Sequence, residues 1–200
     1  MKYVSPALAL LAAFAFHAPT ANATPITFVG NLTGANEVPP VNSPGTGLAT
    51  IILDPTAQTI QINATFSGLT SNDNAAHIHC CAPLGTNVGI ATTVPAFPGF
   101  PLGVTSGAYS QSFDLTQASI YNPAFVTMEG GLPQAEAALI AGIENGQSYF
   151  NIHTMTNPNG EIRSQLFPVP EPASLILLGS ALGPVLLGFG LVRRKGVGGS

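Results

Sequence analysis

Three histidines form the clearest metal-binding pattern in this sequence. His77 and His79 stand two residues apart in a run that is typical of a β-strand, so both imidazoles leave the same face of that strand. His153 stands in a second run of the same kind. Cys81 continues the face of the histidine pair if the first strand extends that far. Imidazole binds both copper and zinc, and a thiolate favours zinc or Cu(I), so these four residues predict a single copper or zinc site.

Other interpretations of the same residues stay open. Paired histidines also serve as core or rim residues that are hydrogen-bonded to the backbone, and spacing alone does not bring His153 beside the pair. Cys80 and Cys81, the two cysteines of the chain, are adjacent. Neighbouring side chains alternate in direction along a strand, so a disulfide between them requires a distorted turn. The alternatives are such a disulfide, two free thiols near the histidines, or Cys81 as a ligand with Cys80 buried.

The charged residues exclude several classes of function. Residues 24–168 contain eight acidic residues and a single basic residue, Arg163. Nucleic acids and anionic lipid surfaces attract clusters of Lys and Arg, so neither is expected as a partner. Arg163 is predicted to form a structural ion pair with Glu37, Glu161 or another carboxylate. No catalytic residue is predicted, because the nucleophile elbow, the phosphate-binding loop and the zinc-protease helix are absent from the sequence.

The elements that must position these side chains are mostly β-strands. Eight short runs are rich in apolar, β-branched or aromatic residues and are separated by Gly, Pro, Asn and Asp. They span residues 26–33, 47–53, 59–66, 75–80, 88–94, 107–113, 149–154 and 161–167. A helix is predicted at 133–143, where alanine and leucine follow a proline in the first turn. The pattern predicts a mainly β fold, an antiparallel β-sandwich or Greek-key-like barrel of about eight strands with one short helix.

The amino-terminal residues predict export. Lys2 supplies a positive start, residues 7–16 are apolar, and residues 21–23 form a small-x-small cleavage site. Residues 1–23 are therefore predicted to be a signal peptide that Sec-type export machinery recognises and that is cleaved after Ala23. The alternative is an uncleaved anchor, although the apolar run is about half of the ~20 residues that a spanning helix needs.

The carboxyl-terminal residues, 169–200, predict a second sorting step. Residues 173–192 carry no charge and are long enough to cross a bilayer. The basic end at 193–195 follows directly and is expected to stay cytoplasmic; it consists of Arg193, Arg194 and Lys195. The segment before the apolar stretch is Val169-Pro170-Glu171-Pro172, and its prolines keep it extended and accessible to a protease.

This tail resembles the PEP-CTERM sorting signal. In that signal a Pro-Glu-Pro motif, here 170–172, an apolar helix and an Arg-rich end are recognised by a membrane transpeptidase called exosortase. The resemblance implies that the apolar segment spans the inner membrane only transiently and that the body of the protein is then released or attached to surface material. A permanent single-pass anchor is the alternative.

The middle of the chain, about 28–167, resembles the CHRD domain, an extracellular β-rich module. Three groups of residues carry the resemblance, in the family's order: Leu32-Thr33-Gly34-Ala35-Asn36-Glu37-Val38-Pro39-Pro40; Gly68-Leu69 with Ala76-His77-Ile78-His79; and Tyr149-Phe150-Asn151-Ile152-His153-Thr154 with Gly160-Glu161-Ile162-Arg163. The family is known mainly as a module without a general biochemical activity, so the resemblance favours a surface or matrix module over an enzyme.

Two functions follow from these observations. The first is an exported cell-surface or matrix-associated module, without enzymatic activity, that binds an extracellular polymer or another envelope component. The second is a single-site copper- or zinc-binding protein with a redox or metal-handling role, which explains the His-x-His spacing better.

Overall fold

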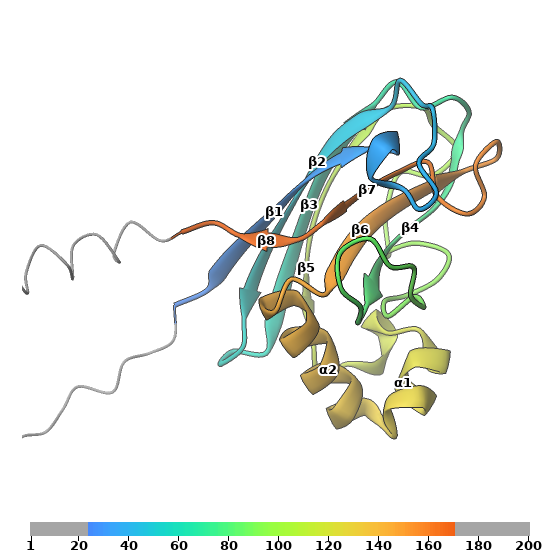
Figure 1. The fold of residues 1–200 in the computed structure, drawn as a ribbon. Helices are drawn as coiled ribbons and strands as arrows, with labels where there is room; N and C mark the ends of the chain where they lie inside the picture. Colours follow the sequence, from blue (N-terminus) through green and yellow to red (C-terminus); the bar gives the residue numbers. More distant parts are fainter. Residues whose placement is uncertain (1–23, 171–200) are drawn as a thin grey trace, which may run out of the picture.

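One antiparallel sheet that curls into a half-barrel forms the body of the fold (Figure 1). The computed structural model describes residues 24–170. Its strands are β1 (Ile26–Thr33), β2 (Thr46–Asp54), β3 (Thr59–Ser67), β4 (Asp73–Cys80), β5 (Gly107–Asp114), β6 (Ser148–Thr154), β7 (Ile162–Gln165) and β8 (Phe167–Pro168). Their order across the sheet is β4-β6-β7-β1-β2-β3-β5, and β8 also pairs with β1. Every strand pairing is antiparallel, so the predicted fold class is confirmed.

The alternation of apolar and polar residues explains which face of each strand is buried. In β3, Ile60 and Ile62 point into the core while Gln61 between them is only partly buried. The turn that joins β2 to β3 is held by Asp54, whose Oδ1 accepts the backbone N–H groups of Thr56 and Ala57 at 3.0 and 2.8 Å. A short acidic side chain that binds its own backbone in this way starts a turn, which places the two strands in register.

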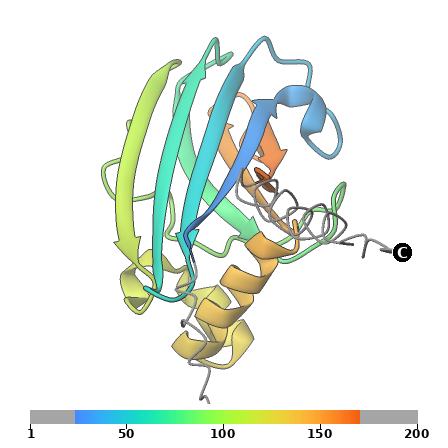
Figure 2. The same cartoon turned by 90° about the vertical axis from the view of Figure 1, so that its left-hand side faces the viewer.

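Two α-helices gather at one end of the curled sheet (Figure 2). They are α1 (Pro123–Glu129) and α2 (Leu132–Glu144), and two 3₁₀ turns, η1 (Gly34–Asn36) and η2 (Ala118–Ile120), precede them in the chain. The buried face of α2 includes Leu139 and Ile143. The sequence predicted α2 and missed α1, although Asn122 caps α1 by accepting the Ala124 N–H at 3.0 Å. The described part of the chain, residues 24–170, therefore contains two α-helices where one was expected.

The predicted strand at 88–94 is wrong, because this segment belongs to a loop. The loop runs along the outer edge of β4, where the Cys80 N–H donates to the Gly89 carbonyl and the Ala91 N–H donates to the Ile78 carbonyl. Isolated bridges, such as His79 with Ile90, replace a continuous ladder. The apolar composition of the segment reflects burial, since Ala91 is fully buried, and not strand pairing.

Several predicted features of the termini lie outside the described residues. These are the signal peptide at 1–23, the apolar segment at 173–192 and the basic end at 193–195. Within residues 24–170, no helix combines the length and the apolar character that crossing a bilayer requires.

Candidate metal centre

The pairing of β4 with β6 brings the three histidines together. His77 lies opposite Asn151 in the ladder and His79 lies opposite Tyr149. His153 follows Asn151 by two residues and so leaves the same face of β6. The ring centroids are 4.8 Å apart for His77 and His79, 4.6 Å for His77 and His153, and 5.8 Å for His79 and His153. The sheet thus places three imidazoles from two strands in mutual contact.

Each imidazole is oriented by a hydrogen bond from its Nδ1 atom to a backbone carbonyl. The acceptor is Pro95 O for His77 at 3.1 Å, Val88 O for His79 at 2.7 Å, and Pro158 O for His153 at 3.0 Å. The first two carbonyls belong to the loop along β4, and the third belongs to the loop after β6. A carbonyl oxygen can only accept, so Nδ1 carries the proton in all three rings.

The Nε2 atoms of the same rings have no partner. All three Nε2 atoms are closed off from solvent, and no group within residues 24–170 forms a hydrogen bond with them. Because Nδ1 holds the proton, each Nε2 carries an unshared lone pair. One ring nitrogen from each histidine lies within 4.8 Å of a ring nitrogen of the other two.

Burial keeps these imidazoles neutral. Burial, with a smaller contribution from the neighbouring histidines, lowers the pKa of His77 to about 3. Burial likewise lowers the pKa of His79 to about 4 and lowers the pKa of His153. Neutral imidazole is the form that binds metal ions, so at neutral pH all three Nε2 lone pairs are free to do so.

The donor set fits one transition-metal ion. Zn–N bonds of 2.0–2.1 Å at tetrahedral angles place the bound nitrogens about 3.4 Å apart. The ligand nitrogens of the three rings now lie within 4.8 Å of one another, so each pair would have to approach by at most about 1.4 Å. The hydrogen bond from Nδ1 to a carbonyl is the usual outer contact of a metal-binding histidine, because it fixes the tautomer and the orientation of the ring. Copper and zinc both suit an all-imidazole set.

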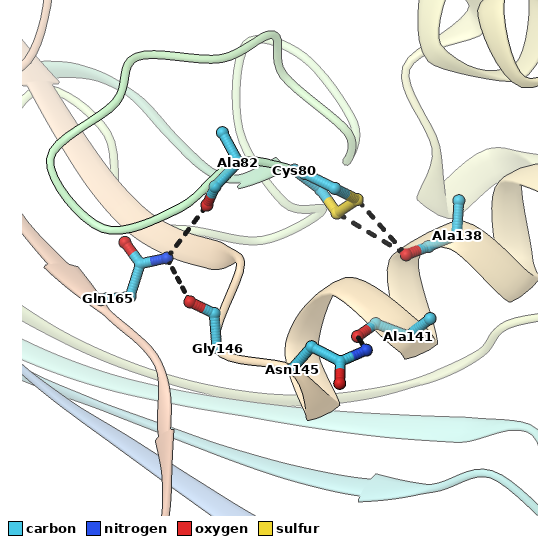
Figure 3. The surroundings of a disulfide bond; sticks show 8 residues. Cys80, Ala82, Ala138, Ala141, Asn145, Gly146 and Gln165 are labelled. Carbon is cyan, nitrogen blue, oxygen red and sulfur yellow. Dashed lines mark hydrogen bonds between the residues drawn. A yellow bond between two sulfur atoms is a disulfide. The ribbon is translucent and has the colours of Figure 1, made fainter.

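The fourth predicted ligand, Cys81, does not join the histidines. Its sulfur is bonded to that of Cys80, so the structure contains the vicinal disulfide, which leaves no thiolate to bind a metal (Figure 3). The two sulfurs face α2 and lie 3.7 Å (Cys80) and 3.3 Å (Cys81) from the carbonyl oxygen of Ala138. Gly142 supplies the space on the helix, because a Cβ there would overlap both sulfurs.

The predicted ion pair of Arg163 involves Glu37 and not Glu161. Arg163 Nε lies 3.8 Å from Glu37 Oε2, and both side chains are buried. Burial raises the pKa of Glu37 to about 7, although Arg163 acts to lower it. The carboxylate of Glu161 is instead held by four neighbours, which donate hydrogen bonds of 2.6–3.2 Å from Ser43, Thr70, Thr154 and Asn157. These donors occupy both Glu161 oxygens, so Arg163 is free to turn toward Glu37.

Sequence reasoning missed two further side chains beside the cluster. Tyr149 stacks on His79 with ring centroids 4.5 Å apart, and the Arg163 guanidinium lies 4.4 Å from the centre of the Tyr149 ring. Asn151 is 1% exposed, and its Oδ1 has no hydrogen-bond partner within residues 24–170. Both residues alternate with Phe150 and Ile152 on β6, so the same-face rule that paired His77 with His79 could have found them.

Comparison with known proteins accounts for most of the chain. The CHRD domain family matches residues 28–166, and the PEP-CTERM protein-sorting motif matches residues 168–195. The sorting motif marks an exported protein with a carboxyl-terminal sorting tail that exosortase-type machinery recognises, and it indicates a surface or extracellular location. No curated protein and no solved structure matches the chain. Because the domain match covers more than half of the sequence, the chain belongs to the CHRD domain family.

Proposed function

We propose that this exported protein is a cell-surface module whose CHRD domain binds a single copper or zinc ion through His77, His79 and His153. One observation carries the proposal: in three neighbouring imidazoles every Nε2 is buried without a partner, while every Nδ1 is held by a backbone carbonyl. This is the arrangement that a metal ion requires of its histidine ligands.

The cost of the same arrangement without a metal argues against purely structural histidines. A buried acceptor that lacks a partner costs about 1–3 kcal/mol, so three such atoms together cost about 3–9 kcal/mol. That cost is comparable with the 5–15 kcal/mol by which a typical domain is stable. Apolar side chains at these positions would avoid it, and a bound ion offsets it by accepting all three lone pairs.

The closed position of the cluster favours metal binding over catalytic turnover. His77 is 2% exposed and His153 is 7% exposed, so a substrate would have to displace the surrounding loops to reach the ion. A surface module without enzymatic activity fits both this burial and the sorting tail.

A partner in the extracellular polymer or the envelope would meet the outer surface of the domain. A pocket of about 440 Å³ lies there, with Leu84, Phe167 and Arg163 in its lining. Leu84 is 70% exposed and Phe167 is 50% exposed, so both present apolar surface to a partner. The pocket supports the binding part of the proposal, and the histidine cluster supports the metal part.

The metal content of the protein tests the proposal. The protein is purified from its native host without a histidine tag, and its copper and zinc are measured by mass spectrometry against protein concentration. We expect close to one ion per chain, and loss of that ion in His77→Ala. The matched control is Asn74→Ala, since this exposed residue lies on the same strand as His77 and should not affect the ion. Metal well below one ion per chain in the wild-type protein would refute the proposal.

A further inference from the structure

A fourth buried acceptor lies on the same face as the three histidines. Asn151 sits on β6 between His77, its partner on β4, and Arg163, its partner on β7. Directly opposed residues in an antiparallel ladder have Cβ atoms about 4.5–5.5 Å apart, so the Asn151 amide neighbours the His77 imidazole. Asn151 is 1% exposed, and its Oδ1, like the three Nε2 atoms, has no hydrogen-bond donor within residues 24–170.

The orientation of the Asn151 amide follows from its other neighbours. Gly160 packs against it with a φ of +122°, and a Cβ on Gly160 would lie 2.6 Å from Asn151 Nδ2 and 2.7 Å from Glu37 Oε1. The amide nitrogen and the Glu37 carboxylate therefore both lie beneath Gly160, a residue that has no side chain. Burial raises the pKa of Glu37, and Asn151 acts to lower it, as the NH₂ group of an amide does when it faces a carboxylate.

The amide oxygen is consequently left on the opposite side. Glu37 lies beside Arg163, on the β7 side of Asn151. The two ends of an amide lie on opposite sides, so Nδ2 on the Glu37 side leaves Oδ1 for the β4 side, where His77 is the ladder partner of Asn151. An oxygen lone pair cannot bond the lone pairs of the Nε2 atoms, so this oxygen needs a cation or a donor as much as they do.

We propose that Asn151 completes the metal centre, with Oδ1 as the fourth ligand beside the three imidazoles. This inference rests on the metal-binding function proposed above and specifies the donor set as three nitrogens and one oxygen. Four protein ligands close the coordination sphere of copper or zinc, which is typical of structural sites, whereas catalytic sites keep a position for water. An oxygen ligand also suits Zn(II) and Cu(II) better than Cu(I), because Cu(I) prefers soft ligands.

The number of water molecules on the ion distinguishes a closed site from an open one. Protein purified from its native host is stripped of metal and loaded with Cu(II). It is then examined by electron paramagnetic resonance in ordinary water and in water enriched in the magnetic isotope of oxygen. A copper-bound water broadens the spectrum in the enriched solvent. We expect no broadening in the wild-type protein, since Asn151 occupies the position that water would take.

Substitution of the amide should open that position. In Asn151→Ala we expect solvent-dependent broadening, because water can take the position of the lost ligand. We also expect at least about tenfold weaker Cu(II) binding, since even the loss of an outer contact to a ligand costs about that much. The control is Asn74→Ala, an exposed asparagine on β4 whose Nδ2 donates to Met155 Sδ. Its spectrum should equal that of the wild-type protein.

Two results would overturn the inference and leave the proposed function intact. One is solvent broadening in the wild-type protein, which shows that water is the fourth ligand. The other is an Asn151→Ala spectrum and affinity equal to those of the wild-type protein. The wild-type measurement decides the matter even if the variant fails to fold. A wild-type protein that binds no Cu(II) at all would instead refute the proposed function itself.

Discussion

Acidification of the metal-free protein should weaken the fold through its buried histidines. Burial lowers the pKa of His77 to about 3 and that of His79 to about 4, against an ordinary value of 6.5. At a pH below 6.5 but above the folded pKa values, the unfolded chain takes up protons at these histidines that the folded chain does not. The stability that the neutral imidazoles retain above pH 6.5 is therefore lost progressively as the pH falls toward the folded pKa values.

The magnitude follows from the distance between the working pH and the unfolded pKa. At about pH 5 the solution is about 1.5 units below the unfolded pKa, and each unit is worth about 1.36 kcal/mol of unfolding free energy. Each of the two imidazoles therefore lowers the unfolding free energy by about 2 kcal/mol, and the pair lowers it by about 4 kcal/mol. Burial lowers the pKa of His153 as well, so it adds to the loss.

Glu37 acts in the opposite direction. Burial raises its pKa from 4.5 to about 7, so the folded chain takes up a proton that the unfolded chain does not until the pH reaches about 4.5. Its contribution is fully present below the unfolded pKa and is lost as the pH rises through 7. Between about pH 8 and pH 5 it adds at most about 2.7 kcal/mol, and solvent in the neighbouring pocket screens part of this. The wild-type protein should thus lose only about 1–2 kcal/mol over that range.

Glu37→Gln separates the two effects, because the amide does not titrate. Urea denaturation of the chelator-treated protein at about pH 8, 6 and 5 gives the unfolding free energy of wild type and variant. We expect the variant to lose about 4 kcal/mol between about pH 8 and pH 5, roughly twice the wild-type loss or more. Equal losses in the two proteins, or a variant whose stability does not change over this range, would refute the reasoning.

Three further predictions concern other parts of the chain. Gly142→Ala should destabilise the fold by about 1–3 kcal/mol in thermal melts, because its Cβ overlaps the disulfide, whereas Gly89→Ala, with open space around it, should change stability by less than about 0.5 kcal/mol. Glu161→Gln places an NH₂ group against the hydrogen-bond donors around Glu161 and should lower the unfolding free energy by about 1–3 kcal/mol. A smaller loss would show that these hydrogen bonds do not hold the Glu161 carboxylate as described. Intact-mass analysis of the native protein should show loss of the residues after about Pro172, and a form that retains Ser200 would contradict processing of the tail.

The strands were predictable because their pattern is local. β1 occupies 26–33, as predicted, and β3 extends the predicted 59–66 by one residue, since alternation along a strand reports which face is buried. The segment 88–94 was misassigned because its apolar residues satisfy burial in a loop, and composition cannot separate burial from strand pairing. The helix α1 carried the signals of an asparagine cap and a proline in the first turn, but its seven residues are too short for a clear period.

The candidate site was only partly predictable. The pairing of His77 with His79 follows from the strand period, whereas the position of His153 depends on the register between β4 and β6, which the sequence does not state. The sequence left the role of Cys81 undecided between a disulfide, a free thiol and a metal ligand for a similar reason. Whether adjacent cysteines bond to each other depends on the backbone at the end of β4 and on the space that Gly142 leaves on α2, and both are tertiary features.

The ligands of the bound ion test the central claim most directly. X-ray absorption at the copper or zinc edge, on protein purified from its native host, reports the atoms around the metal. The account predicts one ion per chain with three imidazoles at about 2.0–2.1 Å and no sulfur neighbour. A spectrum with fewer than three imidazoles, or with sulfur at about 2.3 Å, would contradict a centre formed by His77, His79 and His153.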